Sequence, residues 1–112
     1  MVLIANFRPP TMKFCLEFPA GLLDDTNFEE NAKREVEEET GYVVEKFTEI
    51  PLPAIYCDPW KSNESAFMYI GTINGDDPNS YKGQKLDSEE NIKVIKVPFD
   101  ENLMKNVSEI AK

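Results

Sequence analysis

The stretch Arg34-Glu35-Val36-Glu37-Glu38-Glu39-Thr40-Gly41 places four carboxylates in the expected last turns of a helix. A helix carries partial negative charge at its C-terminal end, so each acid there costs a few tenths of a kcal/mol, up to about 1. Glu35 and Glu39 stand four residues apart and repel each other across one turn. On a 3.6-residue period, one face carries Glu35, Glu38 and Glu39. Glu37 points away from that face. Because the run breaks two helix rules at once, it indicates a functional site.

A cation resolves such a cluster of carboxylates. Three oxygen ligands on one rigid element suit a hard divalent ion, and Mg²⁺ uses one or two carboxylates together with waters and substrate phosphates. The alternative is a solvated acidic face, the more common role of a Glu-rich helix. The preceding residues favour the metal site through the family resemblance that they complete, because residues 17–21, Glu-Phe-Pro-Ala-Gly, lead through Leu22-Leu23-Asp24-Asp25-Thr26 into the helix.

This arrangement resembles the Nudix hydrolase box, Gly-x5-Glu-x7-Arg-Glu-U-x-Glu-Glu-x-Gly-U, where U is a bulky apolar residue. The C-terminal half of the box matches at Arg34, Glu35, Val36, Glu38, Glu39, Gly41 and Tyr42. Further segments resemble the human-type ADP-sugar pyrophosphatases, which cleave ADP-ribose: residues 7–10, 17–22, 24–25, 58–59 and 74–77. The resemblance implies an α/β protein with the Nudix fold, a mixed β-sheet sandwiched between helices (α/β/α).

The N-terminal half of the box departs from the pattern. Twelve residues separate Gly21 from Arg34 where the pattern has thirteen, and the box glutamate falls on Asn27 or Thr26. In the family this glutamate mostly braces the loop by pairing with the box arginine. Glu30, four residues before Arg34, is the expected partial substitute.

The resemblance implies metal ligation by Glu35, Glu39 and the backbone carbonyl of Ala20. Glu38 belongs to the same shell and is expected to share in catalysis, although Arg34, four residues earlier, offers it an ion pair instead. The expected cofactor is Mg²⁺, with Mn²⁺ as a substitute. It would neutralise developing charge on the diphosphate and lower the pKa of a bound water.

The general base in this branch is a glutamate on the loop before the last strand. Counting back from residues 97–98 places it at Glu90, with Glu89 as the second choice. The alternative is a merely charged loop. Such a base would make catalysis depend on closure of the loop.

Further residues match family positions that contact substrate. Arg8 matches the arginine on the diphosphate, and its planar fork suits phosphate oxygens. Leu22 and Asp58 match positions that line the substrate pocket. Trp60 replaces a usual glycine, and either Trp60 or Tyr56 is available to stack on a base, although hydrophobic packing is the more common role of such a ring.

Composition supports a small-molecule enzyme. The chain has 112 residues, 41% of them hydrophobic, and is expected to form one domain that buries somewhat over 60%, roughly, of its unfolded surface. A net charge of -9 disfavours nucleic acid and acidic membranes as partners. The chain has no histidine, which eliminates histidine-based triads and zinc ligands. Cys15 and Cys57 are expected to be buried free thiols, which favours a reducing, cytoplasmic location, with the nucleus as a second compartment. No membrane segment is predicted.

Hydrophobic periodicity predicts strands at residues 2–7, 14–18, 42–47, 66–73 and 92–97. A helix is predicted from a capping box at Thr26 with Glu29, or at Asn27 with Glu30, to a stop at Gly41. Its residues 28, 32 and 36 are expected to dock on the sheet. A long polar loop over 74–90 is expected to be mobile unless a ligand orders it. A last helix is expected after an Asp100 cap, with an apolar face at residues 103, 107 and 110.

The sequence thus predicts Mg²⁺-dependent hydrolysis of ADP-ribose or a related ADP-sugar to AMP and a sugar phosphate. An oxidised nucleoside diphosphate is the alternative substrate. A catalytically impaired Nudix domain that binds a nucleotide or a protein is the alternative of another class. Residues 1–112 are expected to be a single Nudix hydrolase domain truncated at both ends, and the resemblance raises a homodimer as an expectation.

Overall fold

A computed structural model describes residues 1–24, 27–50 and 53–112 of the chain. Its elements in chain order are β1 (Val2–Arg8), β2 (Lys13–Glu17), α1 (Phe28–Thr40), β3 (Lys46–Glu49), β4 (Ile55–Tyr56), β5 (Ser65–Ala66), β6 (Tyr69–Thr72), the 3-10 turn η1 (Pro78–Ser80), β7 (Ile92–Lys96) and α2 (Leu103–Ile110).

The central sheet has three strands in the order β2-β1-β7, and both pairings are antiparallel. Ile4 lies opposite Glu17 on one side and Val94 on the other. Residues that face each other across antiparallel strands point to the same face of the sheet. Ile4 is only 1% exposed and lies at the centre of the core, together with Ile92. The same face also carries Arg8 and Glu17, at the edge of this apolar centre.

Helix α1 begins and ends where the local chemistry predicts. The side chain of Asn27 accepts a hydrogen bond from the Glu30 N–H at 3.1 Å, which selects one of the two expected caps. Thr26, the alternative cap, lies outside the described residues. At the other end Gly41 adopts φ 81° and donates its N–H to the Glu37 carbonyl at 2.8 Å. This left-handed conformation suits glycine and ends the helix.

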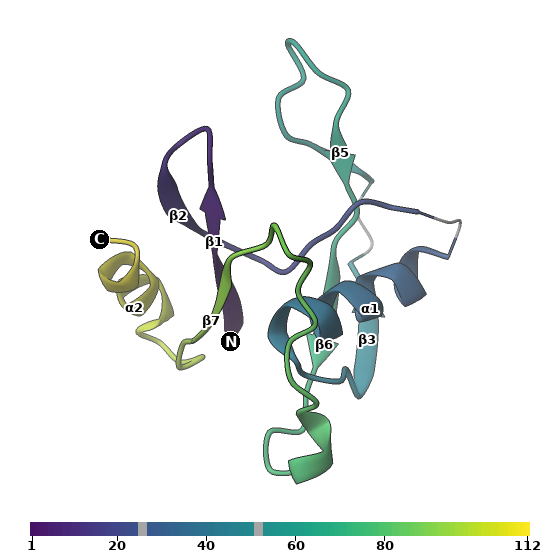
Figure 1. The fold of residues 1–112 in the computed structure, drawn as a ribbon, viewed down its shortest axis with the longest axis vertical. Helices are drawn as coiled ribbons and strands as arrows, with labels where there is room; N and C mark the ends of the chain where they lie inside the picture. The colour runs from purple at the N-terminus through teal and green to yellow at the C-terminus, as the bar shows by residue number, and fades with distance from the viewer. Residues whose placement is uncertain (25–26, 51–52) are drawn as a thin grey trace.

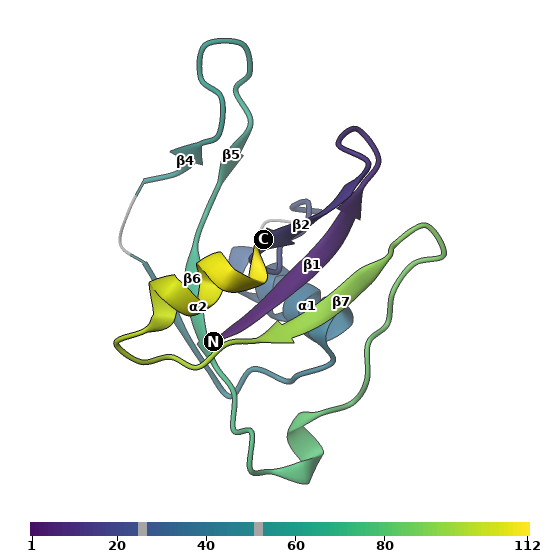
Figure 2. The same cartoon turned by 90° about the vertical axis from the view of Figure 1, so that its left-hand side faces the viewer.

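Figure 1 shows α2 at the left, the central sheet beside it, and α1 together with the β3–β6 pair at the right. Helix α1 contacts β1 and β7 on one side and β3 and β6 on the other. Figure 2, turned by 90°, shows α2 on the opposite side of the central sheet from α1. The α/β class and the Nudix arrangement are therefore confirmed, with the described strands distributed over three antiparallel sheets.

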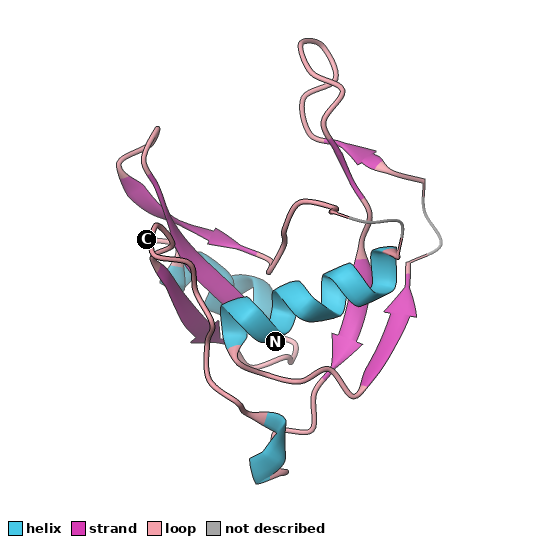
Figure 3. Cartoon of the chain, turned by 45° about the vertical axis from the view of Figure 1, so that its right-hand side comes forward, coloured by secondary structure: helices cyan, strands magenta, loops and turns pink. Residues whose placement is uncertain are grey.

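The β4–β5 hairpin is the most separate part of the fold. Ile55 pairs with Ala66 and Tyr56 with Ser65, and the connecting loop carries residues 57–64. Figure 3 shows this hairpin projecting beyond the rest of the chain. The predicted strand over 66–73 is interrupted between β5 and β6, and the predicted strand over 42–47 begins at Lys46 instead. Tyr42 forms only an isolated bridge with Tyr81.

Helix α2 is capped differently from the prediction. Asn102 is the residue that precedes the helix, while the Asp100 side chain accepts a hydrogen bond from the Asn102 N–H at 2.8 Å. Asp100 therefore stabilises the turn that leads into the helix rather than the first helical turn. Leu103 and Val107 are partly buried and Ile110 is exposed. Neither described helix reaches the length and apolar character that a bilayer crossing needs.

The core is smaller than the composition suggests. Among the described residues, four hydrophobic side chains are buried, at Leu3, Ile4, Ile92 and Val97. The accessible surface is 8459 Å², whereas a folded protein of this mass exposes about 6,300 Å². Both cysteines are free thiols, but only Cys15 is partly buried and Cys57 is exposed, so the prediction that both are buried is wrong. Because the described strands form three separate sheets, many large apolar side chains remain exposed.

Candidate active site

Glu39 is the most buried carboxylate of the acidic run. It is 5% exposed, and its Oε2 accepts a hydrogen bond from the Ala20 N–H at 3.1 Å. Burial raises the pKa of Glu39 to about 7, repulsion from Glu35, Glu90 and Glu17 acts in the same direction, and the Ala20 hydrogen bond opposes the rise. This bond joins the last turn of α1 to the loop after β2. The structure therefore places Glu39 and Ala20, two of the predicted ligand positions, side by side.

Glu35 reaches the same loop one turn earlier. Its side chain is largely buried, and a Cβ built on Gly21 would overlap the Glu35 carboxylate. Glycine is therefore required at position 21 for this carboxylate to lie against the loop. Burial raises the pKa of Glu35, while the neighbouring Arg34 guanidinium lowers it and the carboxylates of Glu38 and Glu90 raise it.

Arg34 pairs with Glu38 as well as with Glu35. Its Nη1 lies 3.1 Å and 3.3 Å from the two carboxylate oxygens of Glu38. Its Nη2 donates to Asp24 at 2.9 Å. Glu30, the expected partner of Arg34, approaches Lys33 instead, so that prediction is wrong. Asp24 thus links the loop to the box arginine, the role that the family gives to the missing box glutamate.

Arg8 is held by a two-point ion pair. Its Nε and Nη2 each donate to one carboxylate oxygen of Glu17 at 2.8 Å. The pKa of Arg8 is raised chiefly by this hydrogen bond, and the charge of Glu39 adds a smaller contribution in the same direction. Nη1 has no partner among the described residues and is available to an anion.

Glu90 lies within electrostatic reach of the cluster, because its carboxylate raises the pKa of both Glu35 and Glu39. Its own Oε1 accepts a hydrogen bond from the Asp87 N–H at 2.9 Å, and its N–H donates to the Asp87 carbonyl at 3.0 Å. Glu89 is exposed, and no ion pair or hydrogen bond of its side chain is found in the described ranges.

The remaining predicted residues lie at the margins. Leu22 follows the Ala20–Gly21 loop with a side chain that is 88% exposed, and its carbonyl accepts a hydrogen bond from Asn31 at 3.2 Å. Asp58 lies on the projecting β4–β5 loop and pairs with Lys61 at 3.1 Å. On the same loop Trp60 is 82% exposed, with the Lys61 Nζ 5.3 Å from its ring centre. Tyr56 is exposed as well.

The acidic cluster suits a divalent cation chemically. Two carboxylates, on Glu35 and Glu39, are desolvated against one loop with raised pKa values, so added positive charge would stabilise their ionised forms. Within the described residues, no group of three or more Asp, Glu or Cys side chains is arranged to hold a metal ion by itself. An open shell of this kind fits Mg²⁺, which keeps waters and phosphate oxygens as ligands.

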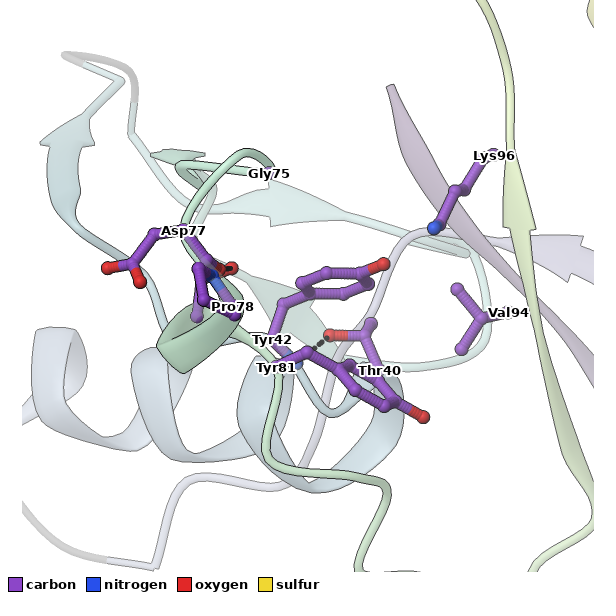
Figure 4. A pocket seen from close by; sticks show the side chains of 9 residues that line it. Thr40, Tyr42, Gly75, Asp77, Pro78, Tyr81, Val94 and Lys96 are labelled. Atoms are coloured by element: carbon purple, nitrogen blue, oxygen red, sulfur yellow. Dashed lines mark hydrogen bonds between the residues drawn. The ribbon is translucent and has the colours of Figure 1, made fainter.

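A separate pocket of about 670 Å³ lies beyond the C-terminal end of α1. Figure 4 shows Lys96 and Val94 of β7 pointing toward the rings of Tyr42 and Tyr81. The two ring centres are 5.1 Å apart, and the Lys96 Nζ lies 5.2 Å from the Tyr42 ring centre. None of the predicted ligands or substrate residues lines this pocket, so the acidic cluster, rather than the larger cavity, is the candidate active site.

Three participants in the site were missed by reasoning from the sequence. Glu17 repels Glu39 and holds Arg8; Asp24 holds Arg34; Gln84 bonds the helix end. Glu17 and Arg8 belong to the quoted family segments, so their opposite charges, one within a predicted strand and one directly after the preceding predicted strand, were an available signal. For Asp24 the sequence offered only the presence of an acidic residue in the segment before the helix, with no spacing that marks it as the partner of Arg34. Gln84 sits in a polar loop with no pattern that marks it.

Comparison with known proteins gives this site its context. The NUDIX domain family matches residues 1–112. An ADP-sugar pyrophosphatase of Mus musculus is 41% identical over 105 residues, which are 92% of this chain and 47% of that protein. An ADP-ribose pyrophosphatase of Bacillus subtilis is 31% identical over 92% of this chain and 54% of its own length. A GDP-mannose pyrophosphatase of Yersinia pestis is 33% identical over 92% of this chain and 53% of its own length.

The chain therefore belongs to the NUDIX domain family. It spans about half the length of these curated relatives.

Proposed function

We propose that this chain carries the metal-dependent hydrolytic site of an ADP-sugar pyrophosphatase, which converts ADP-ribose or a related ADP-sugar to AMP and a sugar phosphate. The observation that carries the proposal is the approach of Glu35 and Glu39 to one loop, at Gly21 and at the Ala20 N–H. Two desolvated carboxylates on one loop are the arrangement that a diphosphate with bound Mg²⁺ would complete.

In this proposal Glu35, Glu39 and the Ala20 carbonyl hold the metal ion, with Glu38 contributing from its position on the same face. Bound Mg²⁺, or Mn²⁺ in its place, would neutralise charge on the diphosphate and make a water a better nucleophile. Arg34 divides its guanidinium among Asp24, Glu35 and Glu38, which balances the charge of the cluster before substrate arrives.

Arg8 binds the diphosphate in this proposal. Glu17 holds the Nε–Nη2 edge of the guanidinium and leaves Nη1 for a phosphate oxygen. A planar, pre-oriented guanidinium loses little freedom when it binds, so it supports positioning of the substrate.

Glu90 takes the proton from the attacking water in this proposal. Its charge raises the pKa of both Glu35 and Glu39, and because only its Oε1 is bonded to the Asp87 N–H, its Oε2 is the oxygen that would accept the proton from water. Leu22 and Asp58 border the substrate, with Asp58 reaching it from the β4–β5 loop.

The single domain over 1–112 and the homodimer remain predictions of the family resemblance.

A second substrate class is favoured by one comparison. The Yersinia pestis relative is named a GDP-mannose pyrophosphatase, so a GDP-sugar is the alternative to an ADP-sugar. Both reactions break the same diphosphate and differ in the nucleotide released, AMP or GMP.

The test is AMP release from ADP-ribose with Mg²⁺, using the wild-type chain, Glu39→Gln, Glu37→Gln and a chelator control. Glu37 lies on the same helix, pairs only weakly with Lys85 at 3.8 Å, and is a matched control. We expect AMP from wild type and Glu37→Gln, with a loss of at least about a hundredfold in Glu39→Gln. Release of GMP from GDP-mannose, without release of AMP from ADP-ribose, would show that the substrate is a GDP-sugar. Nucleotide binding by a cooperatively folded chain that makes neither product would support the binding-domain alternative.

A further inference from the structure

The loop between η1 and β7 is tied to the last turn of α1 at three points. The Lys82 N–H donates to the Gly41 carbonyl at 2.7 Å, and the Lys85 N–H donates to the Glu38 carbonyl at 2.8 Å. Between them the side-chain Nε2 of Gln84 donates to the Glu39 carbonyl at 2.7 Å. Carbonyls at a helix C-terminus lack intrahelical partners, so the loop supplies what this helix end requires.

Gln84 makes one bond more than its neighbours. The same Nε2 donates to the Ile92 carbonyl at 3.2 Å, at the start of β7. One amide group therefore joins the backbone of Glu39 to the strand that begins two residues after Glu90. A side-chain amide has two N–H donors, so it can satisfy both carbonyls at once.

The segment that these contacts enclose carries Glu90. Hydrogen bonds between Asp87 and Glu90 form a turn at the centre of this segment. At its end the Phe7 N–H donates to the Asn91 carbonyl at 3.1 Å. In the described chain, the Gln84 side chain spans from this segment's base to α1, the helix of Glu35 and Glu39, whereas the Lys85 Nζ approaches Glu37 of the same helix only at 3.8 Å.

We propose that Gln84 is a positioning residue that latches the Glu90 segment to α1. The latch keeps residues 85–91 over the acidic cluster while leaving the Glu90 carboxylate free to exchange Asp87 for water. This inference rests on the proposed function for the role of Glu90 as the base, whereas the latch itself is a property of the fold.

The latch is tested first without catalysis, by hydrogen exchange on the full chain. We expect the hydrogen-bonded amides of Lys85, Asp87 and Glu90 to exchange about tenfold faster in Gln84→Ala, because each lost hydrogen bond changes local opening by up to about that factor. Gln84→Glu is nearly isosteric, cannot donate when ionised, and should act in the same direction. Lys85→Ala keeps its backbone bond to Glu38 and should exchange as wild type does. Unchanged exchange in both Gln84 variants would overturn the latch.

Turnover tests the link to Glu90. We expect Gln84→Ala to lower kcat about tenfold while KM stays within about twofold, because substrate contacts remain and only the base is displaced. In a Glu90→Gln background the same change should cost less than twofold, roughly, because residues that act through one another are not additive. Equal losses in both backgrounds would show that Gln84 acts elsewhere.

The two failures are distinguishable. A wild-type chain that releases no nucleotide from either sugar substrate would overturn the proposed function, and the exchange result would then decide the latch alone. A wild-type chain that turns over, with Gln84→Ala indistinguishable from it in exchange and in kcat, would overturn the latch and leave the proposed function standing.

Discussion

Ala20 and Glu39 are nineteen positions apart in the chain, yet the Ala20 N–H donates to the Glu39 carboxylate at 3.1 Å. This bond fixes the loop after β2 against the end of α1 and is the contact that assembles the candidate site. It stabilises the ionised carboxylate, but burial acts in the opposite direction and dominates, since the pKa of Glu39 is raised to about 7. The site therefore holds a negative charge whose neutralisation has measurable consequences.

The metal-free chain should lose stability as the pH rises from about 5 to about 8. The pKa of Glu39 is raised in the folded state from 4.5 to about 7, so in this window the folded state binds more protons than the unfolded state. The free energy of unfolding then falls with increasing pH. Glu35, whose pKa is also raised, acts in the same direction. Thermal melting across this range measures the effect, and Glu39→Gln should flatten the profile.

Mg²⁺ should reverse that trend. A cation bound to the ionised carboxylates stabilises the folded state, so the gain in Tm on adding Mg²⁺ should be larger at about pH 8 than at about pH 5. Chelation should remove the gain. An equal gain in Glu39→Gln would mean that the ion binds elsewhere.

Gly21→Ala should impair the site while leaving the fold intact. Gly21 lies outside the positive-φ region, so the backbone accepts alanine, but the new Cβ would displace the Glu35 carboxylate. We expect Mg²⁺-dependent turnover to fall at least about tenfold, with the change in stability below about 1 kcal/mol because a flexible side chain gives way. Gly75→Ala is the matched control, since a Cβ at that position would meet no atom within 4 Å. Full activity in Gly21→Ala would argue against Glu35 as a ligand.

Arg8→Lys should raise KM for ADP-ribose about tenfold while kcat changes little. A lysine keeps the charge but cannot hold the two-point pair with Glu17 and offer a third donor to phosphate in one plane. Steady-state kinetics measures this, with Lys13→Ala as the control because Lys13 pairs with Arg8 in the strand register. Stability should change by less than about 1 kcal/mol, since the pair is largely exposed. An equal rise of KM in Lys13→Ala would show that the effect reflects the positive charge of this region and not the geometry of the Arg8 guanidinium.

Three glycine substitutions should separate backbone strain from steric overlap. At Gly75 an alanine would meet neither strain nor overlap, so the stability of Gly75→Ala should be near that of wild type. Gly83 has φ 83° in open space, so Gly83→Ala should lower the free energy of unfolding by about 1 kcal/mol. Gly41→Ala adds overlap, since its Cβ would lie 2.6 Å from the Tyr81 ring and 2.8 Å from the Gly83 backbone. It should lose more, about 2–4 kcal/mol, by thermal or denaturant unfolding. Equal losses at Gly41 and Gly83 would show that Tyr81 moves aside freely.

The sequence by itself determined the helix and its end at Gly41, and it limited the helix start to two candidate caps. Asn27 and Gly41 act through bonds to residues three and four positions away, and such local bonds follow from residue type and spacing. The acidic run also predicted that Glu35 and Glu39 share a face, because helix geometry fixes that relation without any other part of the chain.

Tertiary structure alone decided the partners of these residues. Arg34 pairs with Asp24 rather than Glu30, and Gln84 bonds Glu39 across 45 positions, because contacts between distant segments depend on how the loops cross the helix. The pKa of Glu39 likewise follows from burial against the Ala20 loop, which no local pattern encodes. The exposed Cys57 and the small core follow from the separate β4–β5 hairpin and the divided sheets, since burial depends on which layers meet.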